Sequence, residues 1–308
     1  MKNYSHIPVL LTECLDHLKL SNGTQVIDCT LGLGGHSLEI LKKIGKKGKL
    51  MVFEQDGVNL KEAKKRLAKY EKQIIFVHDN FENIKKHVKK HKFKPEAILF
   101  DLGLSSPHID NPERGFAIKD DGPLDMRFDK RISITAEKVV NKTSEKELAN
   151  IIFHYGEEKR SRIIARKIVE RRKEKPIKTT HELAEIIKNT IKGPARIHPA
   201  KLTFQALRIY VNRELEVLES ALDEAIKLLV PGGHIVVISY HSLEDRIVKR
   251  KFRYYAQDCI CPKELHICQC NFKKRLYILT KRPIIPLGIE VESNPRARSA
   301  KLRVAKAI

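Results

Sequence analysis

The chain has 308 residues, of which 42% are hydrophobic and 32% are charged, so it is long enough to bury a sizeable core. Its formal net charge of +22 indicates a polyanionic partner such as nucleic acid, the alternative being a lysine-rich composition without such a partner. No apolar run approaches the ~18 residues that cross a bilayer, and no signal peptide follows Met1, so we expect a cytoplasmic protein. Six cysteines in a chain of this length exclude a disulfide scaffold.

The first hundred residues alternate short apolar runs with charged segments of helical periodicity. Strands are predicted at 24–29, 49–54, 74–78 and 96–103, and helices at 36–44 and 57–70. Strands that alternate with helices at this spacing predict a parallel sheet with helices on both faces.

The pattern changes after residue 103. Residues 104–130 are rich in Pro, Gly and Asp and predict an irregular loop, whereas residues 143–192 are helical, with capping sequences at Thr143-Ser144 and Thr179. Helical periodicity continues over 200–229, and residues 228–239 predict a turn followed by a strand. Further strands are predicted at 276–281 and 300–305, and a helix at 243–256.

Because the apolar run after residue 228 resembles a continuation of the first sheet, we predict one discontinuous α/β core. The core comprises residues 1–110 and 201–308, and an all-helical subdomain at 111–200 is inserted into it. Two sequential domains are the alternative.

A glycine-rich turn follows the first strand, between Asp28 and His36. Gly32, Gly34 and Gly35 allow a close approach of the backbone to a ligand, and the helix that follows offers free N–H groups to a negative group. In an open α/β sheet, ligands bind at the carboxyl ends of the strands. The turn therefore predicts a nucleotide-like ligand, the alternative being a tight turn that binds nothing.

Two features favour S-adenosylmethionine over a dinucleotide. The dinucleotide fingerprint requires a third glycine at position 37, where the chain has Ser37. The acidic Asp28 suits the amino group of a methionine moiety, and Glu54 at the end of the second strand suits the two hydroxyls of a ribose.

The loop after the fourth strand contains Asp101, Ser105 and Ser106. The lone pair of an aromatic amine is delocalised into the ring, so a methyl-transfer site must accept a hydrogen bond from the amine and hold it in line with the donor. These three residues are the candidate catalytic groups. A helix cap built from the same residues is the alternative.

Several motifs together resemble the bacterial 16S rRNA (cytosine-N4)-methyltransferase family. They are DCTLGLGGHS (28–37), DLGLSSPHID (101–110), ERGF (113–116), GPLDMR (122–127), YGEEKRSRIIA (155–165), IHPAKLTFQALRIYVN (197–212), SYHSLEDRIVK (239–249) and NPRARSAKLRVA (294–305). They cover nearly the whole chain in the expected order.

The resemblance implies a class I S-adenosylmethionine-dependent methyltransferase (Rossmann-like) core with an inserted helical domain. It implies N4-methylation of a cytosine in the decoding region of 16S rRNA, with free rRNA or the small ribosomal subunit as substrate. Carried over by position, the cofactor contacts are Gly34, Gly35, His36, Glu54, Phe81, Asp101 and His108. Glu54 replaces a common Asp and His108 replaces a common Gln, and Phe81 has a plain core role as its alternative.

A basic helix is predicted at 157–174 in the inserted segment. Its cationic residues suit phosphate groups, although the acids of the same helix offer them partners as well. They are Lys159, Arg160, Arg162, Arg166, Lys167, Arg171, Arg172 and Lys173. Arg296, Arg298, Lys301 and Arg303 form a second basic patch, in which a strand would place Arg296 and Arg298 on one side.

Four cysteines, Cys259, Cys261, Cys268 and Cys270, form a CxC-x6-CxC pattern with His266 between the pairs. Four thiolates can bind zinc tetrahedrally, but CxxC is the usual spacing, and free thiols in a loop are the favoured interpretation. The motif His241-Ser242 is interpreted as a cap for the next helix, with Ser242 at the N-cap and Asp245 reaching back.

Three other functions compete with rRNA methylation. They are a methyltransferase acting on DNA, a non-catalytic ribosome-assembly factor with a vestigial cofactor fold, and an NAD-dependent oxidoreductase. Ser37 and the missing catalytic Lys or Tyr pattern argue against the oxidoreductase. The sequence leaves the oligomeric state open.

Overall fold

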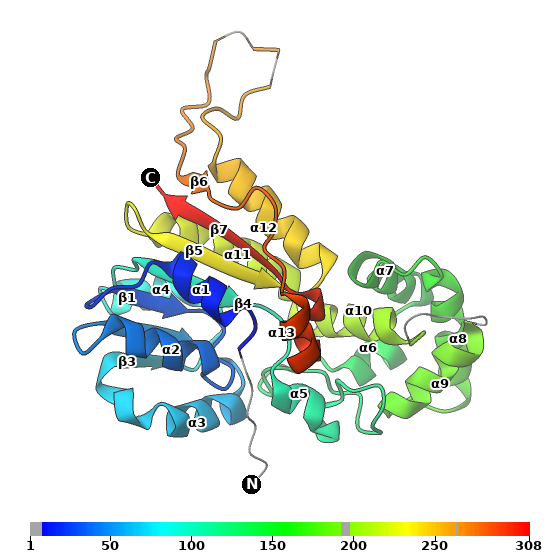
Figure 1. Cartoon of the computed structure of the whole chain (residues 1–308). Coiled ribbons are helices and arrows are strands. Elements are labelled where there is room, and N and C mark those ends of the chain that lie inside the picture. The colour runs from blue at the N-terminus through cyan, green and yellow to red at the C-terminus, as the bar shows by residue number, and fades with distance from the viewer. Residues whose placement is uncertain (1–7, 192–197, 263, 266) are drawn as a thin grey trace. The chain divides into compact units, whose positions relative to one another are not determined.

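The structure, a computed structural model, describes residues 8–191, 198–262, 264–265 and 267–308. These residues form two compact units, one made of the chain up to Gly103 together with Leu215–Ile308, the other of Leu104–Glu214. The first unit contains a seven-stranded sheet and the second is built from helices (Figure 1). None of the described helices is long and apolar enough to cross a membrane.

The sheet of the first unit has the strand order β3-β2-β1-β4-β5-β7-β6. Strands β1 to β5 are parallel to one another, whereas β7 is antiparallel to both β5 and β6. The strands are β1 (Gln25–Asp28), β2 (Lys49–Phe53), β3 (Ile74–Val77), β4 (Ala97–Asp101), β5 (His234–Ser239), β6 (Leu276–Ile278) and β7 (Lys301–Ala307). The predicted α/β fold with a Rossmann-like parallel sheet is confirmed.

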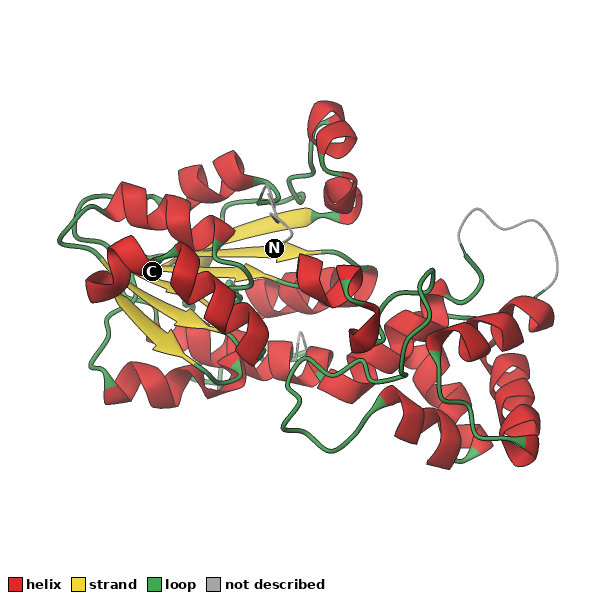
Figure 2. Ribbon diagram, turned by 90° about the horizontal axis from the view of Figure 1, so that it is seen from below, coloured by secondary structure: helices red, strands yellow, loops and turns green. Residues whose placement is uncertain are grey.

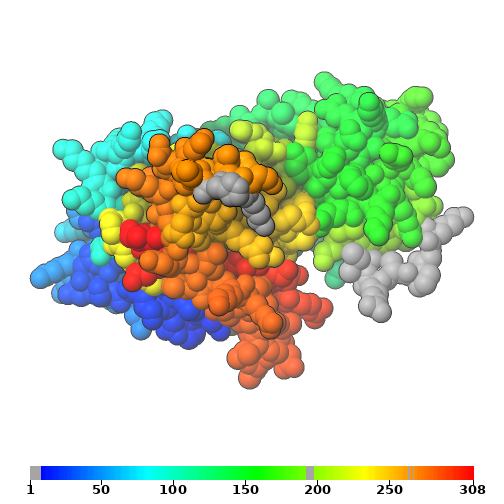
Figure 3. All heavy atoms as spheres, turned by 90° about the horizontal axis from the view of Figure 1, so that it is seen from above, coloured from blue at the N-terminus to red at the C-terminus, as the bar shows by residue number. Residues whose placement is uncertain are grey.

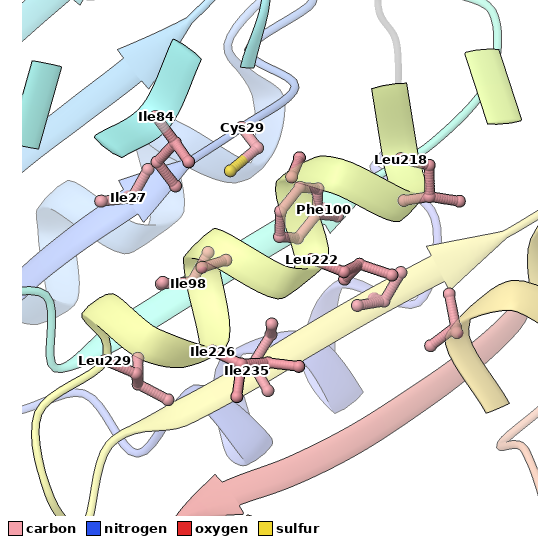
Figure 4. Packing of buried hydrophobic residues seen from close by; sticks show 14 of the residues in the cluster. Ile27, Cys29, Ile84, Ile98, Phe100, Leu218, Leu222, Ile226, Leu229 and Ile235 are labelled. Carbon is pink, nitrogen blue, oxygen red and sulfur yellow. The ribbon is translucent and has the colours of Figure 1, made fainter. Parts of the chain in front are cut away.

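Successive strand residues point to opposite faces of the sheet, and each face has its own apolar core. Val26 packs on the face covered by α1 (Leu11–Leu18), α2 (Gly35–Ile44) and α3 (Gly57–Arg66). Its neighbour Ile27 packs on the face covered by α4 (Ile84–Lys90), α11 (Glu214–Leu228) and α12 (Ser242–Tyr255). Figure 2 shows helices on both sides of the strands, and Figure 4 shows Leu222 and Ile226 of α11 against the sheet.

The second unit has its own core, formed by the apolar faces of its helices. The helices are α5 (Ser106–Asp110), α6 (Ala136–Lys142), α7 (Glu145–Gly156), α8 (Ser161–Glu174), α9 (Thr180–Thr190) and α10 (Lys201–Asn212). The predicted caps are present, since Ser144 accepts from the backbone N–H of Glu147 and Thr179 forms a capping box with Glu182.

The inserted unit is larger than the predicted segment 111–200. Phe204 and Leu207 of α10 belong to the core of the second unit, which places α10 there rather than in the sheet domain. The helical run predicted over 200–229 is broken at Arg213, whose φ of 52° ends α10 before α11 begins. Apolar periodicity is the same on both sides of this break, so it gave no signal of the boundary.

Several local boundaries differ from the sequence predictions. The loop predicted at 104–130 contains the short helix α5, and the helix predicted at 157–174 begins at Ser161. The cap of α12 is His241 with Glu244, one residue before the predicted Ser242 and Asp245. Residues 295–299 form a 3-10 helix, so the strand expected to place Arg296 beside Arg298 begins only at Lys301.

Candidate functional site

Three carboxylates stand at the carboxyl ends of adjacent parallel strands. Asp28 ends β1, Glu54 directly follows β2, and Asp101 ends β4. Because β2, β1 and β4 are neighbours in the sheet, the three acids lie along one edge. Ligands of open α/β sheets bind at this edge.

Asp28 is used by the turn itself. The residue is only 1% exposed, and its two carboxylate oxygens accept from the backbone N–H of Thr30 at 3.0 Å and from the hydroxyl of Ser37 at 2.7 Å. Burial raises the pKa of the Asp28 carboxyl. The structure therefore favours a role in shaping the turn over the predicted contact with a ligand amino group.

The glycine turn needs its glycines for two different reasons. Gly34 is the N-cap of α2 and has a φ of 77°, a left-handed conformation that side chains disfavour. Gly35 is the first residue of α2, and a Cβ there would come within 2.8 Å of Cγ of Pro8. The backbone is therefore held in a shape that other residues do not fit.

Glu54 ties the second strand to the turn. Its carboxylate accepts from the backbone N–H of Gly32 at 2.9 Å and from that of Asp56 at 2.8 Å. Burial raises the pKa of the Glu54 carboxyl to about 8, and the two backbone hydrogen bonds offset only part of this effect. The Asn59 side chain is a further hydrogen-bond partner of Glu54. Since a carboxylate has about four acceptor sites, acceptor capacity for the ribose remains.

Asp101 is the most exposed of the three acids, since it is partly exposed whereas Glu54 and Asp28 are buried. The Tyr240 hydroxyl donates to Oδ1 at 2.7 Å, and Nδ1 of His36 lies 3.4 Å from Oδ2. Its backbone N–H donates to Thr30 Oγ1 at 2.6 Å. Asp101 is therefore fixed in position and still open to a ligand.

His36 lies beside Asp101 in surroundings that favour its protonated form. Its Nε2 lies 3.0 Å from the carbonyl oxygen of Val9, so both ring nitrogens face acceptors. Burial alone lowers the pKa of an imidazole, but the hydrogen bonds with Asp101 and Cys14 outweigh it and hold the pKa of His36 well above its usual range. The predicted cofactor residue thus also orients Asp101.

Sequence reasoning missed three residues of this cluster, namely Tyr240, Cys14 and Thr30. Burial and the nearby Asp101 raise the pKa of Tyr240 well above its usual range, so the phenol keeps the proton that it donates. The predicted sheet could have indicated Tyr240, because this residue directly follows β5, which pairs with β4, and β4 ends at Asp101.

Phe81 begins a 3-10 helix after β3 and is partly buried. Its ring meets that of Phe100 edge to face, with centroids 5.6 Å apart. This contact is the core role named as its alternative, and the predicted contact with adenine stays a prediction.

Ser105, Ser106 and His108 belong to the second unit. Ser105 is the N-cap of α5, and its hydroxyl lies 3.0 Å from Nδ1 of His108. The buried His108 ring packs against Phe116 and Phe128, with centroids 5.1 and 5.0 Å away. The helix-cap alternative therefore describes Ser105, while a contact of these residues with cofactor or substrate stays a prediction.

The basic helix α8 uses part of its charge internally. Lys167 pairs with Glu170 at 2.6 Å, Arg171 with Glu174 at 3.4 Å, and Arg166 with Glu145 at 3.9 Å. Arg172 donates to the carbonyl oxygen of Val140 at 2.6 Å. The cations left for a polyanion are the exposed Lys159, Arg160, Arg162 and Lys173.

The predicted C-terminal basic patch is smaller than expected. Arg303 is buried in β7 and binds the Asp245 carboxylate with two nitrogens, at 2.6 and 3.2 Å. Lys301 lies 3.8 Å from the same carboxylate. These residues join β7 to α12, which leaves Arg298 as the exposed cation of the group.

The four late cysteines converge in the structure, with all four sulfur atoms within 4.8 Å of one another. None of them forms a disulfide. The predicted neighbour His266 lies outside the described residues.

Comparison with known proteins identifies the family of the chain. The sequence profile of the MraW methylase family matches residues 3–308. The ribosomal RNA small subunit methyltransferase H of Clostridioides difficile is 48% identical over 99% of both chains, and that of Halothermothrix orenii is 50% identical over 98% of both. With a full-length match to the family and to these relatives, the chain belongs to the MraW methylase family and is a methyltransferase.

Proposed function

We propose that this methyltransferase transfers the methyl group of S-adenosylmethionine to N4 of a cytosine in 16S rRNA. The observation that carries the proposal is the strand edge at which the glycine turn, Glu54 and Asp101 stand side by side. The close relatives are named as methyltransferases of small-subunit ribosomal RNA, which sets the substrate class. The chain then acts in the cytoplasm, where ribosomal subunits are assembled.

The residues of the first unit fit the cofactor part by part. Gly34 and Gly35 open α2, and the free backbone N–H groups of its first turn suit the carboxylate of the methionine moiety. Glu54 accepts from the ribose hydroxyls, and Asp101, held by His36, attracts the amino group. Phe81 is assigned to the adenine. When bound, the cofactor supplies a methyl group on a positively charged sulfur.

The chain contributes positioning and hydrogen-bond acceptors to the transfer. The lone pair of a cytosine amine is delocalised, so an acceptor for its N–H groups directs the pair toward the methyl group. Asp101 is the proposed acceptor, with the hydroxyls of Ser105 and Ser106 as further candidates. His108 is assigned to the cofactor, as the sequence predicts.

The helical unit is assigned to rRNA recognition. Lys159, Arg160, Arg162 and Lys173 keep exposed charges that are suited to phosphate oxygens. Because such contacts release counterions, binding of rRNA falls as salt rises.

Methyl transfer from labelled cofactor to small ribosomal subunits, naked rRNA and duplex DNA tests the proposal. We expect label on the subunits or rRNA, and mass spectrometry of the digested RNA should place it on N4 of one cytosine. Asp101→Ala should abolish transfer while the chain stays folded by circular dichroism. Label on DNA alone would refute the substrate, and full transfer by Asp101→Ala would refute the assigned site.

A further inference from the structure

The segment between α12 and β6, residues 256–275, brings four thiols to one point. Cys259 and Cys261 lie on its outgoing arm, and Cys268 and Cys270 lie on its returning arm. The sulfur of Cys259 is 3.4 Å from that of Cys268 and 3.8 Å from that of Cys270, and the last two are 3.6 Å apart. Figure 1 shows this segment extending beyond the end of α12, and Figure 3 shows it at the surface.

Little else holds the described part of this segment together. It contains no helix or strand, and its apolar side chains Ile260, Leu265 and Ile267 are exposed, Ile267 by 78%. Its base is fixed where Phe272 meets Tyr254, with ring centroids 5.0 Å apart. Apolar burial therefore explains the position of the base but not the convergence of the arms.

The spacing of the sulfurs suits one tetrahedral metal ion. A disulfide requires sulfurs about 2.05 Å apart, whereas four sulfurs at 2.3 Å from a zinc ion lie about 3.8 Å from one another. The observed separations of 3.4 to 3.8 Å fall near the second value. An iron–sulfur cluster spreads its thiolates over several metal atoms, and the four sulfurs here, all within 4.8 Å, leave no room for that.

Backbone N–H groups surround the sulfurs as they do in metal–thiolate sites. Ile260 donates to Cys270 at 3.5 Å, Cys261 to Cys259 at 3.3 Å, and Gln269 to Cys261 at 3.3 Å. Such donors offset the negative charge that four thiolates place on one ion and orient the ligands.

We propose that Cys259, Cys261, Cys268 and Cys270 bind one structural Zn²⁺ ion that fastens the two arms of this segment. Since four thiolates fill a tetrahedral shell, no position is left for water or substrate, and the ion takes no part in methyl transfer. Its role is to hold an exposed segment that the apolar core does not reach.

The test is the metal content of the full chain purified without added metal or chelator. Elemental analysis should find one zinc per chain, and Co²⁺ exchanged into the site should give the visible absorption of tetrahedral cobalt–thiolate. The double variant Cys268→Ser/Cys270→Ser should lose the zinc and keep cofactor binding in calorimetry. The control Gln269→Ser changes an exposed residue between the same two cysteines and should keep the zinc.

Loss of zinc should also expose the segment to protease. Trypsin should cut after Lys273 or Lys274 at least about tenfold faster in the double variant than in the control, since local opening governs such cleavage. A chain without metal whose four thiols all react freely would overturn the proposal. So would a disulfide between any two of them in mass spectrometry, or iron with sulfide in place of zinc.

Discussion

Replacing Gly34 by Ala tests both the geometry of the cofactor turn and its assignment. Gly34 has φ 77° and ψ 24°, a left-handed conformation that costs a residue with a side chain about 1–2 kcal/mol. The new Cβ would also lie 3.1 Å from Cδ1 and 3.3 Å from Cγ of Leu67, which is fully buried and has little room to move. We expect a total loss of about 2–3 kcal/mol in the stability of the first unit.

A loss of this size is measurable by thermal denaturation. One kcal/mol shifts the melting temperature of a 150–250-residue domain by about 2–4 °C, so Gly34→Ala should melt roughly 5–10 °C lower. Because the altered backbone forms the turn assigned to the cofactor, the affinity for S-adenosylmethionine should fall at least about tenfold in calorimetry.

The matched control is Gly288→Ala. Gly288 also begins a helix, α13 (Gly288–Ser293), but has no left-handed φ, and a Cβ there meets no atom within 4 Å. Its melting temperature and cofactor affinity should match those of the unaltered chain. If Gly34→Ala melted at the temperature of the unaltered chain, the left-handed conformation of residue 34 would be refuted. If it melted lower but bound cofactor normally, the turn would not be the cofactor site.

Three further predictions concern the acids and the basic helix. Tyr240→Phe removes the hydroxyl that holds Asp101 and should lower the unfolding free energy by about 1.5–3 kcal/mol in urea titration; unchanged stability would show that this bond contributes nothing. Hydrogen bonds from the ribose hydroxyls favour the charged form of Glu54, whose pKa without cofactor is about 8. Cofactor binding should therefore release a proton at pH 7, and the affinity for the cofactor should increase as pH rises toward 8. Calorimetry in buffers of different ionisation enthalpy should show a smaller release for Glu54→Gln, and an equal release would contradict the ribose assignment. Arg162→Glu should weaken binding of 16S rRNA in filter assays and lower the slope of log affinity against log salt by about 1, whereas an unchanged slope would exclude this face of α8.

The sequence predicts the sheet well because its strands are short apolar runs that end on polar residues. Val26 and Ile27 show why, since both faces of a central strand are buried and both positions must be apolar. Asp28, Glu54 and Asp101 could be placed at one edge for the same reason, as parallel strands bring their carboxyl ends together.

Other features depend on contacts between distant parts of the chain. Tyr240 reaches Asp101 across 139 positions, and nothing local to either residue announces the pair. The antiparallel β7 is equally hidden, because a strand pattern carries no direction. The sequence around Arg303 is typical of a surface cation, because its partner Asp245 lies 58 positions away.

The three acids of the strand edge differ in how many hydrogen-bond partners they have within the fold, and this difference determines their roles. Asp28 is satisfied by Ser37 and Thr30, so its burial shapes the turn whether or not a ligand is present. Glu54 is held by backbone donors yet retains acceptor capacity, and Asp101 is fixed by Tyr240 and remains partly exposed. A site whose acids are oriented in advance loses less entropy when the cofactor binds, and the donor is then already aligned for an incoming amine.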